Sequence, residues 1–284
     1  MAKQDGASTE SRLSIIIVNW NTCELLRACL RSLLLGQHDD WEAIVVDNAS
    51  TDASVTMAQS EYPSVSLIRN TENLGFARAN NQGIQQSAGR YVLLLNSDTQ
   101  IPPGALAGLV DFMDNQPDVG ACSPQLRTAA DLPQAYAFGN DPSLGYLLRR
   151  GLNRLLLNRP LHDWDVDHTI DVDWVSGACL LLRREALAHV SRLDEQIFMY
   201  FEDVDLCRRI RQRGWRVCYV PQIQITHLGG QSLGQNPQAP AAYQRSLRYY
   251  YAKHYGPISR LCLALSLGLY NQLAKNRENL RSSV

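Results

Sequence analysis

The sequence predicts an α/β fold with an open, mostly parallel β-sheet that carries helices on both faces. Four short apolar runs, rich in Val, Ile and Leu, occupy the N-terminal half: LSIIIVNW (13–20), EAIVVDN (42–48), VSLIRN (65–70) and YVLLLNSD (91–98). Between them lie polar or helix-period segments such as CELLRACLRSLLL (23–35) and GFARANNQGIQQSA (75–88). Continuous apolar runs are typical of parallel strands buried on both faces, and right-handed crossovers then place helices on either side of one sheet.

The size and charge of the chain limit the classes of protein to which it can belong. With 284 residues, 45% of them hydrophobic, the chain can bury the full core of a globular protein. A net charge of -1 excludes an overall electrostatic footprint for nucleic acid. No apolar run reaches the roughly 18 residues that span a bilayer. The start MAKQDGASTESR has no signal-peptide pattern and the seven cysteines form no C-x-x-C pair, so we expect a cytoplasmic protein with reduced thiols.

Polar side chains follow each of the four apolar runs. They are Asn19, Asn21, Asp47, Asn48, Asn70, Asn96, Ser97 and Asp98. Each alone is a common turn or helix-cap residue, but together they predict a nucleotide or sugar-nucleotide pocket, because ligands bind beyond the carboxyl ends of parallel strands. The sequence has no G-x-G-x-x-G after the first strand and no P-loop. A divalent cation would therefore neutralise the diphosphate, and Asp98 is well placed as an oxygen ligand.

The second half of the chain is less regular. Residues 124–170 contain prolines, glycines and paired arginines without steady periodicity, which indicates a long functional excursion or a mobile flap. The segment DVDWVSGACLLLRREAL (171–187) predicts a strand followed by a short helix. Two further helices with apolar and tyrosine-rich faces are expected at AAYQRSLRYYYAKHYG (241–256) and PISRLCLALSLGLYNQLAKNRENL (257–280).

One short stretch, FEDVDLCRR (201–209), crowds three carboxylates in front of two arginines. Acidic residues at the start of a helix and basic residues further along it complement the helix dipole. Gly214 stands where a left-handed residue often ends a helix. A stretch of this kind is usually a solvated helix face, so its role depends on the rest of the chain.

Seven segments, in order, resemble one known family. They are SIIIVNWN, VVDNASTD, NLGFARANNQGI, LLLNSDT, WVSGACLLLRRE, LDEQIFMYFEDVDLCRRIRQRG and ITHLGGQS, which span about residues 13–232. Together they are similar to the inverting family-two glycosyltransferases of the GT-A fold, and within them to the bacterial rhamnosyltransferase-like group. The excursion at 124–170 and the tail after residue 235 lie outside the resemblance.

The resemblance implies a metal-dependent, inverting hexosyltransferase of cell-surface polysaccharide synthesis. It would move a sugar, with rhamnose from dTDP-rhamnose as the leading candidate, from a nucleotide diphosphate to a glycan or lipid-linked acceptor. The alternatives are transfer of another hexose from a UDP- or GDP-sugar, and a catalytically idle sugar-nucleotide-binding protein. Residues 11–123 would then form the nucleotide-sugar-binding half, residues 124–235 the acceptor-side and catalytic half of the same domain, and residues 236–284 a C-terminal helical tail.

The resemblance also implies roles for individual residues. The implied donor-binding residues are Asn19, Trp20, Asn21, Asp47, Asn73, Gly75, Arg78, Asn80 and Ser97. Among these, Trp20 would stack on the base, Asp47 would hydrogen-bond the base edge, and Arg78 would be the cationic contact of the ribose and diphosphate region. The implied acceptor-binding residues are Trp174, Ser176 and Gly177.

For the metal, Mg²⁺ or Mn²⁺, the resemblance implies Asp98 and His227 as ligands. Asn96 stands where the family's D-x-D motif often has its first Asp, which removes one carboxylate from the expected site. A single histidine at a strand end is more often a hydrogen-bonded structural residue than a ligand, so the assignment of His227 depends on Asp98 and the order of the motifs.

For catalysis, Asp203 matches the position of the general base and Glu202 would help to orient the acceptor. An inverting transfer needs one ionised carboxylate within hydrogen-bond reach of the attacking hydroxyl. Asp205 and Arg208 are expected to be intrahelical partners, at positions i and i+3.

The tail has its own pattern. Leucines occupy positions 261, 263, 265, 267 and 269 with apolar neighbours, so a helix here is apolar nearly all round and must be covered. The nearby cations and the tyrosines at 249–251 and 255 suit peripheral contact with the inner face of the plasma membrane. Packing on the chain's own domain or on a second subunit, as a homo-oligomer, explains the same composition equally well.

Overall fold

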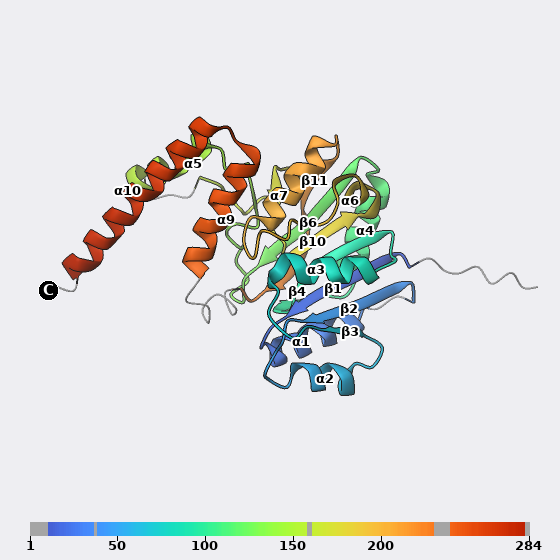
Figure 1. The fold of residues 1–284 in the computed structure, drawn as a ribbon. Coiled ribbons are helices and arrows are strands. Elements are labelled where there is room, and N and C mark those ends of the chain that lie inside the picture. Colours follow the sequence, from blue (N-terminus) through green and yellow to red (C-terminus); the bar gives the residue numbers. More distant parts are fainter. Residues whose placement is uncertain (1–10, 37–38, 158–160, 230–238, 282–284) are drawn as a thin grey trace, which may run out of the picture. The chain divides into compact units, whose positions relative to one another are not determined.

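The computed structural model describes residues 11–36, 39–157, 161–229 and 239–281. The chain divides into two compact units (Figure 1). The first consists of Met1–Asp141 and His162–Pro237, and the second of Pro142–Leu161 and Gln238–Val284.

A large mixed sheet forms the centre of the first unit. In the part of the chain that is described it has nine strands, in the spatial order β3 (Ser66–Arg69), β2 (Trp41–Asp47), β1 (Leu13–Asn19), β4 (Tyr91–Asn96), β10 (Cys179–Arg183), β6 (Val119–Arg127), β11 (Arg216–His227) and β5 (Thr99–Gln100), with β8 (Ile170–Asp171) paired to β11. A separate pair joins β7 (Phe138–Gly139) to β9 (Trp174–Val175). Strand β6 continues through the predicted border at residue 123, so residues on both sides of that border share one sheet.

The four apolar runs form the parallel part of this sheet, as the sequence predicts. Strands β3, β2, β1 and β4 are mutually parallel, and β6 is parallel to β11. Strand β10 lies between β4 and β6 and is antiparallel to both. This insertion places the start of β10 next to the carboxyl end of β4.

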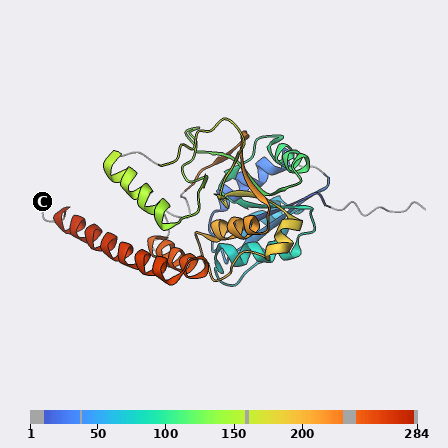
Figure 2. The same cartoon turned by 90° about the horizontal axis from the view of Figure 1, so that it is seen from above.

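Helices cover both faces of the sheet, which confirms the predicted α/β class. They are α1 (Cys23–Leu34), α2 (Ser54–Glu61), α3 (Gly75–Gln86), α4 (Ala105–Asn115), α6 (Arg184–Val190) and α7 (Glu202–Gln212). Helices α1 and α4 lie on one face, and α3, α6 and α7 lie on the other (Figure 2). Helix α1 buries Leu26, Cys29, Leu30 and Leu33, which recur at the spacing of a single helix face.

Helix α3 approaches the sheet closely because of one glycine. A Cβ atom added to Gly83 would lie 2.4 Å from Cγ2 of Ile16 in β1. Any larger residue at this position would force α3 away from the strand, so Gly83 sets the distance between them.

The second unit contains the two predicted tail helices and one helix that the sequence reasoning missed. Helices α9 (Ala239–His254) and α10 (Pro257–Arg281) confirm the tail, and α10 contacts both α9 and α5 (Leu144–Leu157). Helix α5 lies inside the segment that we expected to be an irregular excursion, although its leucines at 144, 147 and 148 follow a helical spacing. None of the described helices is long and apolar enough to cross a bilayer.

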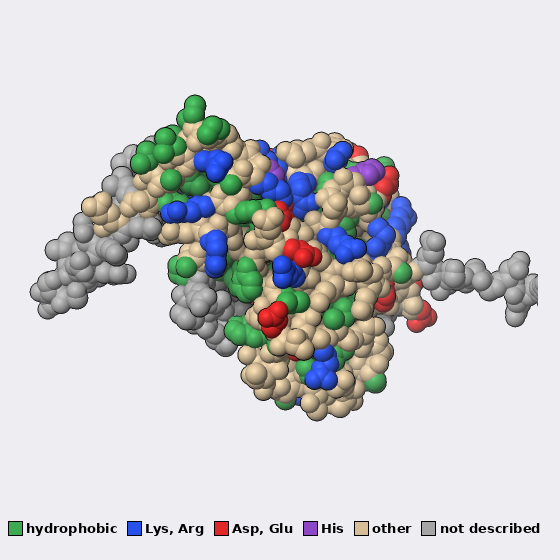
Figure 3. All heavy atoms as spheres, in the orientation of Figure 1, with side chains coloured by type: hydrophobic (Ala, Val, Ile, Leu, Met, Phe, Trp, Pro, Cys, Tyr) green, Lys and Arg blue, Asp and Glu red, His purple; other side chains and the backbone are tan. Residues whose placement is uncertain are grey.

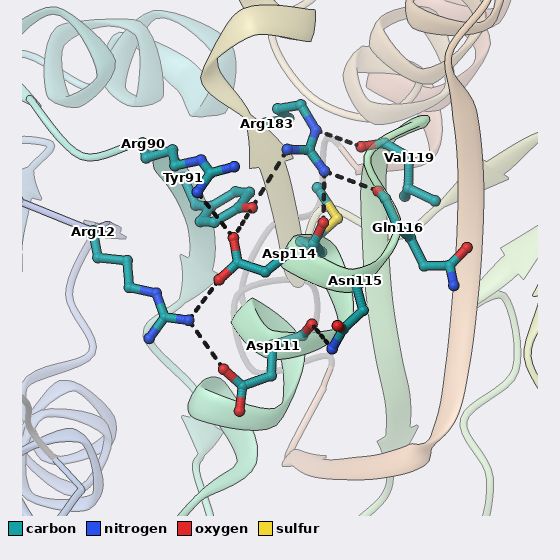
Figure 4. A network of polar contacts seen from close by, with 10 residues as sticks. Arg12, Arg90, Tyr91, Asp111, Asp114, Asn115, Gln116, Val119 and Arg183 are labelled. Carbon is teal, nitrogen blue, oxygen red and sulfur yellow. Dashed lines mark hydrogen bonds and ion pairs between the residues drawn. The ribbon is translucent and has the colours of Figure 1, made fainter.

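A buried arginine holds the edge of the sheet that lies away from the carboxyl ends of the parallel strands (Figure 4). Arg183 is 5% exposed and donates to the carbonyl oxygens of Met113, Gln116 and Val119 at 2.7 to 2.9 Å. These carbonyls end α4 and begin β6, where a helix leaves its last acceptors unpaired. Arg183 therefore joins β10 to α4 and β6.

We predict that Arg183→Leu lowers the free energy of unfolding by about 3 kcal/mol, because buried carbonyl groups lose their donor. Urea unfolding measures the change. The matched control is Arg12→Leu, whose side chain is 41% exposed in its ion pairs and should cost less than about 1 kcal/mol. Equal losses in the two variants would contradict a special role for Arg183.

Candidate active site

The carboxyl ends of β1, β2 and β4 meet at one edge of the sheet, as predicted. The strand register pairs Asn19 with Asp47 and Val18 with Asn96. At the next strand, Asn70 Nδ2 donates to Asn48 Oδ1 over 2.9 Å. The polar residues that follow the four runs are thus neighbours in space.

Asn19 and Asp47 form the buried floor of this edge. Asn19 Nδ2 donates to Asp47 Oδ1 over 3.1 Å, and the backbone N–H of Ser50 donates to Asp47 Oδ2 over 2.9 Å. Thr22 Oγ1 donates to Asn19 Oδ1 over 2.6 Å and lies 3.0 Å from Ser97 Oγ. Asn19 is fully buried and Asp47 is 2% exposed, so these contacts hold both side chains in fixed positions.

The turn after β1 presents an aromatic ring at the surface. Trp20 is 36% exposed although Asn19 before it is buried. Asn21 adopts a left-handed backbone with φ of 52°, and its Oδ1 accepts from the backbone N–H of Thr51 over 2.7 Å. This conformation, which Asn tolerates better than most residues, fixes the turn that carries Trp20.

The start of α3 is tied to the loop that precedes α7. Asn73 Oδ1 accepts from the backbone N–H of Gly75 over 3.0 Å, and the N–H of Phe76 donates to the carbonyl oxygen of Phe198 over 3.1 Å. Gly75 has a φ of +81°, and an added Cβ would lie 2.6 Å from the Phe198 ring. Only glycine satisfies both constraints.

Two other predicted donor-binding residues of α3 differ in their surroundings. The side chain of Arg78 is 55% exposed and lies 3.6 Å from Glu195. Asn80 is 1% exposed and donates to the carbonyl oxygen of Phe76 in its own helix over 3.0 Å. Within the described residues, Asn80 Oδ1 has no hydrogen-bond partner. Arg78 is therefore accessible to a ligand, whereas Asn80 lies beneath the surface.

Asp98 and His227 lie together, as expected for a shared ligand set. His227 Nε2 is 3.1 Å from Asp98 Oδ1 and 3.2 Å from Asn96 Nδ2. On the other side of the ring, Nδ1 is 2.8 Å from Gln134 Oε1. Sequence reasoning missed Gln134, because it lies in the irregular segment and no motif marks it.

The chemistry of this pair fits a divalent cation. An amide oxygen can only accept, so Nδ1 of His227 donates to Gln134, and Nε2 is the ring nitrogen that faces Asp98. When Nε2 carries no proton, its lone pair and the carboxylate oxygen at 3.1 Å would attract a cation between them. Among the described residues no third His, Cys, Asp or Glu joins the pair, so phosphate oxygens or water would have to complete the coordination.

The loop before α7 has an uncommon backbone. Tyr200 and Phe201 both adopt left-handed conformations, with φ of 66° and 70°. Each such residue costs on the order of 1 kcal/mol or more, and residues of this kind cluster at functional sites. Phe201 is buried, and its carbonyl oxygen accepts from the N–H of Asp205 over 2.8 Å. These contacts fix the direction in which α7 begins.

Two backbone N–H groups hold the carboxylate of Asp203 in place. Its Oδ2 accepts from the backbone N–H of Gly177 over 2.9 Å, and its Oδ1 accepts from the N–H of Val204 over 2.8 Å. The carbonyl oxygen of Ala178 accepts from the N–H of Asn96 over 2.9 Å. Residues 177 and 178 therefore join Asp203 to the end of β4, from which the chain continues directly to Asp98.

The neighbouring groups change the pKa values of the adjacent carboxyl groups of Glu202 and Asp203 in opposite directions. It raises the pKa of Asp203, while the N–H groups of Gly177 and Val204 lower it. Burial, followed by the charge of Asp203, raises the pKa of Glu202 well above its ordinary value. In the described part of the chain Glu202 Oε2 has no hydrogen-bond partner. Glu202 is thus the more easily protonated of the two.

The later carboxylate and arginines of α7 stabilise the helix. Asp205 is fully buried and accepts from Arg209 Nε over 2.8 Å, one position beyond the partner we expected. Arg208 lies 3.6 Å from Asp141. The helix ends as predicted, because Gly214 has a φ of +87°.

The predicted acceptor residues lie on the segment that leads into β10. Trp174 Nε1 donates to the carbonyl oxygen of Asn140 over 2.9 Å, and Ser176 Oγ accepts from the N–H of Ala178 over 3.2 Å. Gly177 provides the N–H that binds Asp203. Their contact with an acceptor remains a prediction, as do the ligand contacts of the other named residues.

Comparisons with known proteins identify the family. The family model described as Glycosyl transferase family 2 matches residues 14–158, about half of the chain. The chain belongs to this family of glycosyltransferases. An N-acetylglucosaminyl-diphospho-decaprenol L-rhamnosyltransferase of Mycobacterium tuberculosis is 32% identical over 257 residues, which cover 84% of this chain and 82% of the relative. A poly-beta-1,6-N-acetyl-D-glucosamine synthase of Staphylococcus aureus is 24% identical, covering 78% of this chain and 51% of that relative.

Solved structures agree on the fold. S. aureus TarS matches with a TM-score of 0.58 and 16% identity, covering 84% of this chain and 64% of that one. A mannosyltransferase from Pyrobaculum calidifontis, in complex with GDP-Man and Mn²⁺, matches with a TM-score of 0.54 and 17% identity, covering 91% and 80%. At this identity the likeness concerns the fold alone, and it confirms the expected GT-A type of sheet.

Glu202→Gln should make the stability of the protein less sensitive to pH. A carboxyl group whose pKa is raised on folding stabilises the folded state fully when the pH is below the pKa of the unfolded state. This contribution is lost as the pH rises through the pKa of the folded state. We expect the Tm of the variant to rise relative to the Tm of the wild type as pH increases from about 5 to about 9. Below pH 4.5, the ordinary pKa of a glutamate, we expect no such increase. Thermal unfolding across this range measures the difference, with exposed Glu72→Gln as the control. A difference that stays constant with pH would contradict the buried, protonated Glu202.

Proposed function

We propose that this glycosyltransferase moves rhamnose from dTDP-rhamnose to a saccharide linked to a polyprenyl diphosphate, with inversion at the anomeric carbon and with Mg²⁺ or Mn²⁺. The substrates are supported by the 32% identity to the mycobacterial rhamnosyltransferase, which extends over most of both chains. The product would serve in cell-surface polysaccharide synthesis, at the inner face of the plasma membrane.

One observation carries the chemistry. The Asp203 carboxylate is fixed by the N–H of Gly177 at 2.9 Å, on a segment bonded to the strand end that leads to Asp98. A base and a charge-neutralising group are therefore supplied by two different elements that the sheet holds together. An inverting transfer requires this division, because the base and the leaving group act on opposite faces of the sugar.

In the proposed step, Asp203 takes the proton of the acceptor hydroxyl group. The hydroxyl oxygen forms a bond to the anomeric carbon while the bond from that carbon to the diphosphate oxygen breaks. The electron pair of the broken bond stays on the diphosphate. Glu202, buried beside Asp203, would orient the acceptor rather than take the proton, because its pKa is raised further above the ordinary value.

Asp98 and His227 would hold the divalent cation, and Gln134 would keep the imidazole in the required tautomer. When bound, the cation neutralises the charge that develops on the leaving diphosphate.

The donor would lie along the edge formed by β1, β2 and β4. We assign the base to the exposed ring of Trp20 and to Asp47, and the diphosphate region to Arg78. Asn19, Asn21, Asn73, Gly75, Asn80 and Ser97 complete the proposed donor site. Asn19 and Gly75 would act mainly through the backbone and side chains that they hold in place.

Two alternatives are distinguished by one experiment. Another hexose could be transferred from a UDP- or GDP-sugar by the same residues, or the protein could bind a sugar nucleotide without turnover. A panel of nucleotide sugars scored by thermal shift in the presence of Mn²⁺ identifies the donor, because a ligand that binds only the folded state raises Tm. Turnover with the best donor then separates an enzyme from a binding protein.

We expect Asp203→Asn to lower kcat by at least about a thousand-fold while donor affinity stays within about two-fold, since the change removes the base but keeps the shape of the side chain. Product formation and calorimetric donor binding measure the two effects. Asp205→Asn is the matched control, because it removes a carboxylate from the same helix and should mainly lower stability. Turnover by Asp203→Asn near the wild-type rate would disprove the assignment.

Asp98→Ala and His227→Ala should each abolish the increase in donor affinity that Mn²⁺ gives the wild type, because each removes half of the protein's ligand set. Calorimetric titration of the nucleotide diphosphate with and without Mn²⁺ is the measurement. Asp39→Ala, an exposed position, serves as the control. If chelation of the metal leaves wild-type donor affinity and activity unchanged, the cation is not part of the site.

A further inference from the structure

The second unit concentrates positive charge. Pro142–Leu161 and Gln238–Val284 contain eleven of the chain's 27 Lys and Arg residues and only one of its 28 Asp and Glu residues, Glu278. Their net charge is therefore +10, and the rest of the chain carries -11, which together give the overall -1. The near-neutral total conceals this separation, because the cations come from two segments that are far apart in the sequence.

The same unit exposes an apolar ridge, which we define as Ile258, Leu261 and Leu265 of α10. These side chains are 78%, 62% and 67% exposed, respectively. Their spacing of i, i+3 and i+7 places them on one helix face. The opposite face holds Leu263, which is 4% exposed. The described side chains of α10 are thus buried on one face and exposed on the other, although the sequence predicted that this helix would be covered.

Cations accompany the apolar side chains on this unit. Figure 3 shows hydrophobic side chains gathered over the region of α5 and α10, with Lys and Arg side chains beside them. Leu148 of α5 is also 65% exposed. Arg245 and Arg248 of α9 and Arg260 of α10 are exposed as well.

Two of the four tyrosines that we expected at a membrane surface lie inside the unit instead. Tyr250 and Tyr251 are fully buried, and Tyr251 donates to the carbonyl oxygen of Pro142 over 2.5 Å. The Tyr251 ring also stacks on Tyr255 with 4.5 Å between centroids. They pack the unit internally, so any surface contact depends on the apolar ridge and the cations.

The charge decides between the occupants that an exposed apolar face could have. A second copy of the same unit would bring together two bodies of net charge +10, which repel each other. Nucleic acid would match the charge but would leave three large apolar side chains against a polar partner. An anionic bilayer matches both features, because its surface attracts Lys and Arg and its interface accepts the apolar face of a helix.

We propose that Pro142–Leu161 and Gln238–Val284 form a membrane-surface unit whose apolar ridge enters the interface of an anionic bilayer. The helix lies in the interface and does not span it, in agreement with the finding that no described helix is long and apolar enough to cross. This inference is independent of the proposed sugar transfer, because it involves none of the residues assigned to catalysis or donor binding.

The test is co-sedimentation of the full chain with phosphatidylcholine vesicles that contain or lack phosphatidylglycerol. We expect binding to the anionic vesicles only, and weaker binding as salt is added. Replacing the ridge by Ile258→Ser, Leu261→Ser and Leu265→Ser should weaken binding by at least about ten-fold. The matched control is Leu35→Ser with Leu132→Ser, which removes leucines that are 73% and 61% exposed in the first unit.

A second variant tests the charge without touching the ridge. Arg245→Glu with Arg248→Glu should weaken binding to anionic vesicles by about ten-fold or more, whereas Arg31→Glu with Arg213→Glu in the first unit should not. Absence of binding by the wild type, or equal binding by the second-unit variants and their controls, would overturn the proposal. The ridge would instead be an interface between two copies if the wild type does not bind vesicles and light scattering shows that it is a dimer while the ridge variant is a monomer.

Discussion

The antiparallel strand β10 is the constraint on which the candidate site depends. Its pairing with β4, in which Cys179 faces Leu95, brings the preceding residues to the end of β4. There Ala178 accepts from the N–H of Asn96, and Gly177 donates to Asp203. The strand thereby joins the start of α7 to the edge that carries Asp98, in addition to the contact between α3 and the loop before α7. The left-handed backbone conformations of Tyr200 and Phe201, which are energetically unfavourable, direct α7 towards that edge.

Electrostatics then give the neighbouring carboxylates different properties. Asp203 receives two backbone N–H bonds that oppose the effect of burial, whereas Glu202 Oε2 has no partner in the described residues. Asp205, two positions later, is fully buried but is compensated by Arg209. Three carboxylates within four positions therefore serve as a proposed base, a protonatable neighbour and a structural ion pair. The three carboxylates differ because each points in a different direction around the first turn of α7, and this orientation cannot be read from the number of charges in the sequence.

Much of the fold follows from sequence patterns, and part of the site does not. The runs that became β1 to β4 are predictable because buried parallel strands must be apolar throughout. The pairing of Asp98 with His227 joins distant parts of the chain, so only the resemblance to a family could suggest it. Gln134 and the N–H of Gly177 carry no pattern, since any residue can supply a backbone donor. Helix α5 was missed because glycine, proline and paired arginines outweighed its leucine spacing.

The separation of charge suggests a division of labour between an acidic unit that carries the candidate site and a basic unit that we propose binds a membrane surface. A lipid-linked acceptor is confined to the bilayer, so an enzyme held at the same surface meets its substrate at a raised local concentration.

We propose that Asp203 and the Asp98–His227 pair act on opposite faces of the transferred sugar. The most direct test is the anomeric configuration of the product, determined by NMR and compared with that of the donor. We predict inversion of the configuration. Retention would contradict it, because a single displacement with the base opposite the leaving diphosphate cannot preserve the anomeric centre.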